Sequence, residues 1–362
     1  RYLDLVASGT VADVMPLIYE NRGIVREGLR AISDRCNLGI SALLRVEDID
    51  PDSITAAKLA FLIAPRINAA GRMGDAARGV ELLTTNDDEI ANSLAQALSA
   101  DNIKRQGIEK KIFTEAVSKI EKNGYKYNRI IVVSGENWHG GVIGIVASRL
   151  AEKYGRPAIV LSENGELSHG SARSVGDFSI YNAINSCSYL LTKFGGHEMA
   201  AGISLYTDSI EQFRKSINEY ALSEEMPRPE LKIDCKLKPS ALSLDLAEDI
   251  NVLEPFGNGN PVPIFAILNL EITKITPVGN GKHLRINFSR DSAVFTAMLF
   301  GTTKNAFGFS EGEMVDIAVT LGINEFGGEQ RLSVVIKDIR KSGLNEEALF
   351  KQMDLYESFK SG

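Results

Sequence analysis

Three glycine-rich segments hold three of the four histidines of this chain, and chemistry is most readily expected there. The segments are residues 137–144, 168–174 and 195–202. Glycine carries no Cβ, so its backbone can approach a ligand closely. Each segment adds a polar side chain beside its glycines: His139, Arg173 and His197. The pattern predicts a site where bare backbone and polar side chains meet one ligand.

The expected ligand is an anion, because Gly140 and Gly141 stand where a predicted strand passes into a predicted helix. The first N–H groups of a helix are free, and the helix dipole favours an anion there. Arg173 can add a two-pronged, charge-assisted hydrogen bond to a phosphate. Two helix-end loops, one arginine and two histidines together predict a phosphate cradle. Its members are His139, Gly140, Gly141, Ser171, Arg173, Gly195, Gly196 and His197.

Each of these residues taken alone also has a simpler explanation. Glycine-rich turns between strand and helix are common without any ligand. A lone arginine is usually solvated or paired at the surface, and a single histidine is usually a satisfied structural residue. The phosphate cradle therefore rests on the combination of the three segments.

Asp13 is the carboxylate of greatest interest in the N-terminal part. It follows a predicted strand at residues 3–7, so it stands at a strand end where a metal site can form. A divalent metal needs several hard ligands, and no cluster of Asp and His accompanies Asp13 in the sequence. Charge compensation at a helix N-terminus explains this residue equally well.

Composition sets the outer limits of the interpretation. A chain of 362 residues predicts two or three domains, and 44% hydrophobic with 24% charged residues is typical of globular proteins. No apolar run is long enough to cross a bilayer, so no membrane partner is expected. The net charge of −7 argues against a globally basic nucleic-acid binder, although a local basic cleft remains compatible with it. Three widely spaced cysteines predict a reducing, cytoplasmic setting.

The periodicity of the first half predicts helices followed by an α/β domain. Helices are expected at 20–31 and 56–63, the second ended by Pro65 and followed by a linker that carries Arg66 and Arg72. Residues 87–121 predict one helix of roughly 50 Å, long enough to join two domains. The α/β alternation that follows has predicted strands at 129–134 and 157–162 and helices at 141–154, 180–193 and 209–222.

After a proline-bearing linker at 224–230, the pattern changes to strands separated by Gly and Asn turns. The predicted strands are 231–235, 264–275, 284–288, 293–300, 314–321 and 331–339. Short strands in this arrangement predict a small closed barrel.

Short motifs spread over almost the whole chain resemble the DHH phosphoesterase superfamily, most closely its RecJ family of single-strand-specific DNA exonucleases. The motifs are GTVAD at 9–13, APRINAAGR at 64–72, Asn102 with Arg105 and Gln106, WHGGVIG at 138–144, SARS at 171–174, GGHEMAAG at 195–202 and PFGNGNP at 255–261. The resemblance implies an α/β fold class with five parts. These are the end of a DHH catalytic domain (1–85), a long connecting helix (86–123), an α/β DHH-associated substrate-binding domain (124–228), an OB-fold β-barrel domain (229–343) and a tail (344–362).

The same resemblance implies a two-metal site with Mn²⁺ or Mg²⁺, in which Asp13 is a metal ligand and catalytic residue. The other metal motifs of the family should lie before Asp13, and the chain contains neither of them. With no initiator Met and a start inside a predicted strand, the sequence is expected to be N-terminally truncated. We expect it to be the DNA-holding part of a 5′→3′ exonuclease, inactive by itself.

The substrate roles implied by the resemblance fall into three groups. Arg173, His197 and the start of the helix at Gly140 hold phosphates of the strand end, while Arg66 and Arg72 lie nearer the domain junction. The barrel grips single-stranded DNA with a basic groove and stacked rings. The barrel candidates are Lys282, His283, Arg285, Arg331 and Phe326, each of which also fits a solvated surface role. The implied partners are single-stranded DNA and, as candidates, a single-stranded-DNA-binding protein and a helicase.

Two other functions stay open from the sequence alone. The first is a phosphodiesterase of the same superfamily that acts on short oligonucleotides or a cyclic dinucleotide, although such a substrate does not require the barrel. The second is a non-catalytic module that binds single-stranded nucleic acid.

Overall fold

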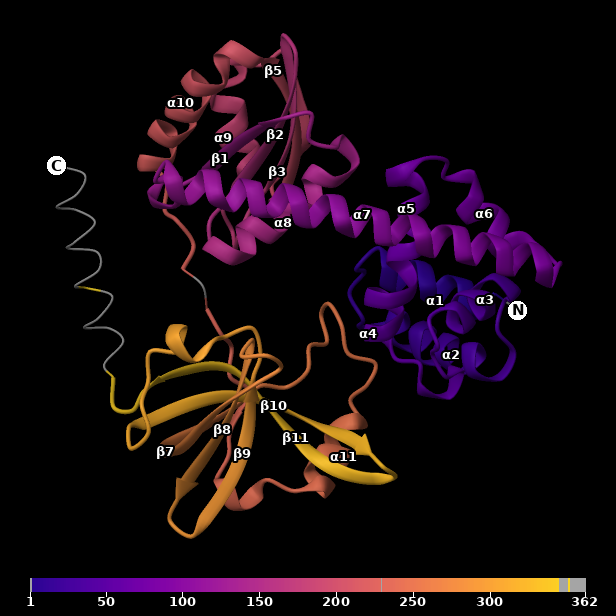
Figure 1. Cartoon of the computed structure of the whole chain (residues 1–362), viewed down its shortest axis with the longest axis vertical. Helices are drawn as coiled ribbons and strands as arrows, with labels where there is room; N and C mark the ends of the chain where they lie inside the picture. The colour runs from indigo at the N-terminus through magenta and orange to yellow at the C-terminus, as the bar shows by residue number, and fades with distance from the viewer. Residues whose placement is uncertain (1, 229, 345–350, 352–362) are drawn as a thin grey trace. The chain divides into compact units, whose positions relative to one another are not determined.

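The structure, a computed structural model, describes residues 2–228, 230–344 and 351, and its chain divides into two units (Figure 1). The first unit comprises Arg1–Met15 and Gly23–Glu230. The second comprises Pro16–Arg22 and Leu231–Gly362. A short segment near the start of the chain therefore belongs with the C-terminal unit.

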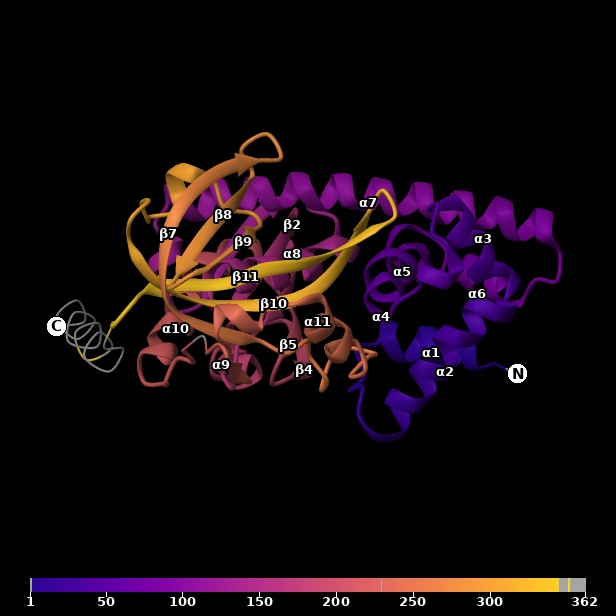
Figure 2. The ribbon, with the colours of Figure 1, turned by 90° about the horizontal axis from the view of Figure 1, so that it is seen from below.

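Helices make up the first part of the first unit. They are α1 (Leu3–Ala12), α2 (Tyr19–Arg35), α3 (Leu38–Val46), α4 (Ala56–Lys58), α5 (Ala64–Met73), α6 (Ala77–Thr84) and α7 (Asp88–Lys122). Helix α7 has 35 residues and is capped by Asp87, whose side chain accepts hydrogen bonds from the N–H groups of Glu89 and Ile90. Figure 2 shows it running from α3 and α6 to the sheet as one helix, which confirms the long helix predicted from the sequence.

Two predictions for this helical part are wrong. Residues 3–7 form the start of α1 and not a strand, because a short apolar run fits either structure. Asp4, Ala7, Ser8 and Val11 are buried at helical spacing. The segment after Pro65 is helix α5 and not a linker, since proline is tolerated in the first turn of a helix.

A five-stranded sheet completes the first unit, in the order β1-β2-β3-β5-β4. Its strands are β1 (Ile131–Glu136), β2 (Ala158–Asn164), β3 (Leu167–Arg173), β4 (Lys193–His197) and β5 (Ala200–Tyr206). Strands β1 and β2 are parallel and joined through α8 (Gly140–Tyr154), as the sequence predicts, and the other pairs are antiparallel. Helices α7 and α8 pack on one face of the sheet. Helices α9 (Ile180–Ser186) and α10 (Ile210–Leu222) pack on the other (Figure 1).

The glycine-rich segments 168–174 and 195–202 lie mostly in strands rather than in helix-end loops. The first lies within β3 except for Ser174, and the second spans the end of β4, a turn at Glu198 and Met199, and the start of β5. The predicted helix 180–193 is correspondingly shorter, because α9 ends at Ser186 and β4 begins at Lys193. Gly and small polar residues have low strand propensity, so the residue pattern did not indicate this hairpin.

The second unit contains a closed five-stranded barrel of the OB type. Its strands are β7 (Phe265–Val278), β8 (His283–Arg290), β9 (Ala293–Leu299), β10 (Met314–Phe326) and β11 (Glu329–Lys341). Pairing of β10 with β7 closes the barrel, and the predicted strands are confirmed for all five. The predicted strand at 231–235 is wrong except at its last residue. The strand observed there is β6 (Cys235–Lys236), which pairs with β7. Helix α11 (Leu244–Asn251) packs on the barrel core through Ile250 and was not predicted.

Candidate phosphate-binding site

The start of helix α8 presents fewer free donors than the sequence suggests, because His139 caps it. The His139 Nδ1 atom accepts a hydrogen bond from the Gly141 N–H at 3.1 Å. The His139 carbonyl accepts from Val142 at 2.9 Å and from Ile143 at 3.2 Å. Among the residues that the structure describes, the N–H of Gly140 has no partner and is exposed. One free backbone donor and the helix dipole therefore remain for an anion.

The glycines of α8 make room for two arginines from other elements. A Cβ on Gly141 would lie 2.6 Å from the carbonyl oxygen of Arg72, at the end of α5. The Arg72 Nη1 atom donates to the Gly141 carbonyl at 3.2 Å. A Cβ on Gly144 would lie 3.1 Å from both the Arg173 Nη2 and the Ser171 Oγ atoms of β3. Both guanidinium groups thus lie against the first two turns of α8.

Arg72 and Arg173 are two neighbouring cations without a carboxylate. Within the described residues, neither arginine forms an ion pair with an acidic side chain. Arg173 Nη1 donates to the Ser171 hydroxyl at 2.9 Å and to the Ala172 carbonyl at 2.8 Å. Burial, and then the charge of Arg72, lower the pKa of the Arg173 guanidinium. An anion bound here would offset both costs.

Arg66, the other arginine of α5, is largely buried within the helical part and forms its contacts there. Its guanidinium pairs with Glu47 and donates to the Leu62 carbonyl, and only 11% of its side chain is exposed. Glu47 also accepts a hydrogen bond from Ser99 on α7 at 2.6 Å. The structure therefore brings Arg72 to the α8 start and holds Arg66 in a separate network.

The register of the sheet extends the site from β3 across β5 to β4. Directly opposed residues of antiparallel strands share a face. Arg173 pairs with Ala200 and Ala200 with His197, so the three form one row. Ser171, Gly202 and Gly195 form the next row on the same face. With strands spaced about 4.8 Å apart, Arg173 and His197 stand roughly 10 Å apart across a floor of small residues.

We call this surface the phosphate shelf. It consists of the α8 start at His139 and Gly140, Arg72, and the two rows Ser171–Gly202–Gly195 and Arg173–Ala200–His197. The opposite face of the same strands packs on α9 and α10, through residues such as Ala172 and Ala201. The shelf face remains exposed at Gly195, Gly202 and His197, beyond the edge of α8.

Gly195 and Gly196 have different reasons to be glycine. Gly196 has φ 153°, and a Cβ there would lie 2.3 Å from the Ala200 carbonyl, so the hairpin itself requires glycine. A Cβ on Gly195 would meet nothing within 4 Å. The open space over Gly195 is where a ligand can approach the backbone.

The hydrogen bonds of the two shelf histidines select their tautomers. The Nδ1 atom of His197 accepts from the Met199 N–H at 3.3 Å, as the Nδ1 atom of His139 accepts from Gly141. In each neutral ring the proton therefore resides on Nε2. Both rings can then donate an Nε2–H hydrogen bond to an anion.

Asp13 does not form a metal site with the residues described. It is the exposed C-terminal cap of α1, not a strand-end residue, and its backbone N–H bonds to the Gly9 carbonyl at 3.0 Å. No group of three or more His, Cys, Asp and Glu in the described chain is arranged to hold a metal ion. A single carboxylate does not fit Mn²⁺ or Mg²⁺, which need several oxygen ligands.

On the barrel, Lys282 and Arg285 are exposed, and Arg285 lies on β8 between Thr276 of β7 and Met298 of β9. His283 packs edge-on against Phe300 with ring centroids 5.2 Å apart. Phe300 is 54% exposed and was not singled out from the sequence, although it ends a predicted strand.

The other two barrel candidates are less informative. Arg331 forms an exposed ion pair with Glu329 at 2.8 Å. The side chain of Phe326 lies outside the described residues.

Comparisons with known proteins agree with this architecture. A family model described as the DHHA1 domain matches residues 124–223, and one described as the RecJ OB domain matches residues 233–338. Two proteins named single-stranded-DNA-specific exonuclease RecJ align with 93% of the chain, that of Bacillus subtilis at 32% identity and that of Escherichia coli at 34%. The crystal structure of RecJ from Thermus thermophilus with Mg²⁺ matches 95% of the chain, with a TM-score of 0.83 and 30% identity. The chain belongs to the RecJ family.

The chain spans about half the length of these RecJ proteins. It covers 43% of the Bacillus protein, 60% of the Escherichia protein and 52% of the Thermus structure. The solved structures of Thermus thermophilus RecJ are complexes with Mg²⁺ in one case and with Mn²⁺ in another. Among the described residues, no helix combines the length and apolarity needed to cross a membrane.

Proposed function

We propose that this chain holds single-stranded DNA for a 5′→3′ exonuclease, with the phosphate of the strand end on the phosphate shelf. The observation that carries the proposal is the pair Arg72 and Arg173, two cations beside a helix N-terminus without a carboxylate partner among the described residues. The names of the RecJ relatives, which are single-stranded-DNA-specific exonucleases, support DNA as the source of that phosphate.

Each shelf residue has a distinct role in this proposal. Arg173 donates its guanidinium fork to two phosphate oxygens, and Arg72 neutralises the remaining charge. The Gly140 N–H and the Nε2–H groups of His139 and His197 complete the donor set. The floor of small residues lets the sugar-phosphate backbone lie flat between the rows. The shelf thus orients the strand end and compensates its charge.

The barrel holds the strand further from its end. Arg285 and Lys282 supply exposed positive charge, and the exposed ring of Phe300 offers a stacking surface for a base. Stacking is tolerant of sequence because every base has a flat face, which suits an enzyme that must accept any strand.

Hydrolysis itself requires more than this chain offers in its described residues. The single carboxylate Asp13 does not make a two-metal site, so we propose that metal ligands of the whole protein lie outside this sequence and that the chain alone is inactive. The family matches at 124–223 and 233–338 support the proposed substrate-binding domain, 124–228, and OB-fold domain, 229–343.

The proposed setting is the cytoplasm, where the thiols of Cys36, Cys187 and Cys235, all free in the structure, would stay reduced. A single-stranded-DNA-binding protein and a helicase are candidate partners of the whole protein on the family resemblance alone.

The proposal is tested by comparing matched single strands that differ only in a terminal phosphate. Fluorescence anisotropy should show tighter binding of a 5′-phosphorylated strand than of its 5′-hydroxyl counterpart. The double variant Arg72→Ala with Arg173→Ala should abolish this difference and leave the affinity for the hydroxyl strand almost unchanged. Equal affinities of the parent chain for both strands would contradict the proposal.

A further inference from the structure

Helix α7 carries a line of lysines that the phosphate shelf does not use. Its buried stripe, Ile112, Ala116 and Ile120, packs on the sheet and α8. Lys104, Lys111 and Lys122 are exposed and lie along a different stripe of the same helix. They are spaced by 7 and 11 residues, which brings them to one side of a 3.6-residue helix. The line is about 27 Å long at 1.5 Å per residue.

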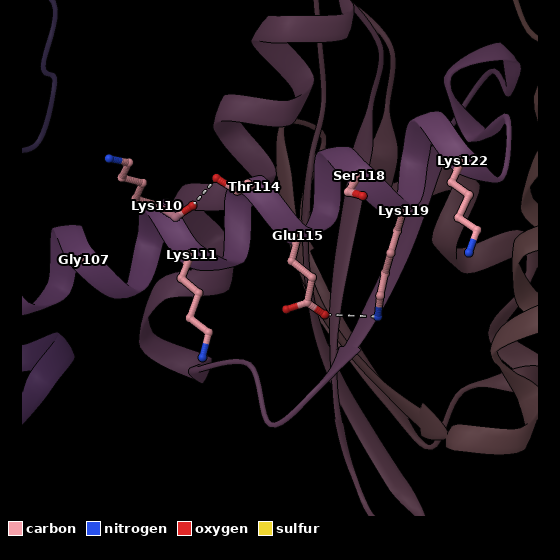
Figure 3. Close-up of a pocket in the computed structure, with 8 residues that line it drawn as sticks. All are labelled: Gly107, Lys110, Lys111, Thr114, Glu115, Ser118, Lys119 and Lys122. Atoms are coloured by element: carbon pink, nitrogen blue, oxygen red, sulfur yellow. Dashed lines mark hydrogen bonds and ion pairs between the residues drawn. The ribbon is translucent and has the colours of Figure 1, made fainter.

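The surface beside Lys111 and Lys122 forms a shallow, open hollow, and Lys104 lies outside its lining. A space of about 730 Å³ is lined by α7 residues alone. Figure 3 shows these residues: Gly107, Lys110, Lys111, Thr114, Glu115, Ser118, Lys119 and Lys122. Gly107, Thr114 and Ser118 are small, so they leave the ammonium groups of the neighbouring lysines accessible to a bulky partner.

The net charge of this hollow is positive, because four lysines and one carboxylate line it. Glu115 is its single acidic residue, and it is already bonded to Lys119 at 3.3 Å and to the Trp138 Nε1 atom at 3.1 Å. Within the described part of the chain, Lys104, Lys111 and Lys122 form no ion pair. Several other charges of α7 are paired, as in Arg105 with Glu109. An unpaired basic line is notable in a protein whose net charge is −7.

The geometry favours an extended polyanion that the lysines contact only at its phosphates. No aromatic side chain lines the hollow, so a single strand would gain no base stacking there. No hydrophobic side chain lines the hollow either, so an acidic peptide would bury no apolar side chain against one there. Duplex DNA carries one charge per about 1.7 Å of axis, which gives a row of cations the highest density of contacts.

We propose that this face of α7, defined by Lys104, Lys111 and Lys122, binds the backbone of double-stranded DNA. The contact is electrostatic and independent of sequence. It is separate from the phosphate shelf, because it needs no strand end and uses none of the shelf residues. It gives the protein a way to stay on duplex DNA that flanks a single strand.

A covalently closed duplex, which has no strand ends, tests the proposal on the whole 362-residue chain. The probe variant reverses the charge of the three lysines: Lys104→Glu, Lys111→Glu and Lys122→Glu. The matched control reverses three exposed cations elsewhere in the first unit: Arg30→Glu, Lys153→Glu and Lys215→Glu. Each reversal changes the charge by two, so three reversals take both variants from −7 to −13.

The probe variant should bind the closed duplex at least tenfold more weakly at low salt. Its slope of log affinity against log salt should fall by up to about 2.7, at about 0.9 for each phosphate that the variant no longer neutralises. The control should weaken much less, and both variants should bind a 5′-phosphorylated single strand almost as the parent does. That last measurement separates this proposal from the phosphate shelf, whose failure would appear there instead.

Three results would overturn the assignment. These are an unchanged duplex affinity in the probe variant, an equal weakening in the control, or displacement of the duplex by an acidic peptide as effectively as by unlabelled duplex. Circular dichroism checks that each variant folds. If the glutamate variant does not fold, the triple Lys→Gln variant decides, and its duplex affinity should fall in the same direction by a smaller factor.

Discussion

At the residue scale, substitution of Arg173 should best distinguish a role in binding DNA from a role in stabilising the fold. Arg173→Ala should cost about 1.5–3 kcal/mol of strand-end binding, the range for hydrogen bonds to charged groups. Arg173→Lys should recover only part of this loss, because an ammonium group cannot reproduce the fork. Titrations of a 5′-phosphorylated strand at one fixed salt concentration measure both effects.

The same variant should not lose stability in the absence of DNA. Arg173 is partly desolvated beside Arg72, so alanine removes a repulsion together with two hydrogen bonds. Arg30→Ala, on the exposed surface of α2, is the matched control and should change binding little. If Arg173→Ala melts like the parent and also binds like it, Arg173 is an ordinary surface arginine and the shelf hypothesis is wrong.

His139 can be separated into its two roles by one substitution. Asparagine at this position can still cap α8 by accepting the Gly141 N–H, but it lacks the Nε2–H donor. His139→Asn should therefore keep the melting temperature and weaken binding of the phosphorylated strand. His139→Ala should lower the free energy of unfolding as well, by about 0.5–2 kcal/mol for removal of a cap. Thermal melting and anisotropy on both variants measure the two roles. Full binding by His139→Asn would leave His139 with a structural role alone.

At the element scale, the segment Pro16–Arg22 is part of the second unit through its contact with the loop 253–260. The Leu17 N–H bonds to the Asn258 carbonyl at 2.6 Å, and Arg22 Nη2 donates to the Leu253 carbonyl at 2.8 Å. A Cβ on Gly257 would lie 2.7 Å from the Leu17 side chain, so this side chain packs directly against the bare Gly257 backbone. The PFGNGNP motif thus receives a segment from the start of the chain.

Leu17 should accordingly contribute to the stability of the second unit. Its side chain is 3% exposed, so Leu17→Ala should lower the free energy of unfolding by about 2–5 kcal/mol. The neighbouring Ile18 is 41% exposed, and Ile18→Ala is the matched control with a much smaller expected effect. Calorimetry resolves the melting transition of the barrel. Equal effects of the two substitutions would show that the segment is not anchored through Leu17.

The elements that could be predicted well from the sequence are those in which hydrophobic residues recur at one clear helical or strand spacing. Helix α7 and the barrel strands carry long regular patterns, and both were predicted. The hairpin β4–β5 was missed because Gly195 and Gly196 carry no pattern at all. For the same reason the shelf was assigned to loops, although most of its residues were identified. The rows across β3, β5 and β4 depend on sheet register, which only non-local pairing determines.

At the scale of the whole molecule, we expect that holding DNA and cutting it are separable properties. The residues of the proposed phosphate shelf and the five barrel strands lie within the described part of the chain, whereas Asp13 is the only candidate metal ligand identified from the sequence. Binding of a single strand should weaken with salt by about 0.7 log units per tenfold salt for each phosphate contacted. An affinity that is independent of salt would be incompatible with phosphate contacts.

The last prediction concerns activity. The chain of 362 residues should not degrade a 5′-labelled single strand even with excess Mn²⁺, because one exposed carboxylate cannot position two metal ions around a phosphodiester. Gel analysis of the labelled strand after long incubation measures this, and Asp13→Ala is the decisive control. Degradation that persists in Asp13→Ala would come from a contaminating nuclease. Degradation that is abolished by Asp13→Ala would show that this chain does assemble a catalytic metal site, and the separation of holding from cutting would then be wrong.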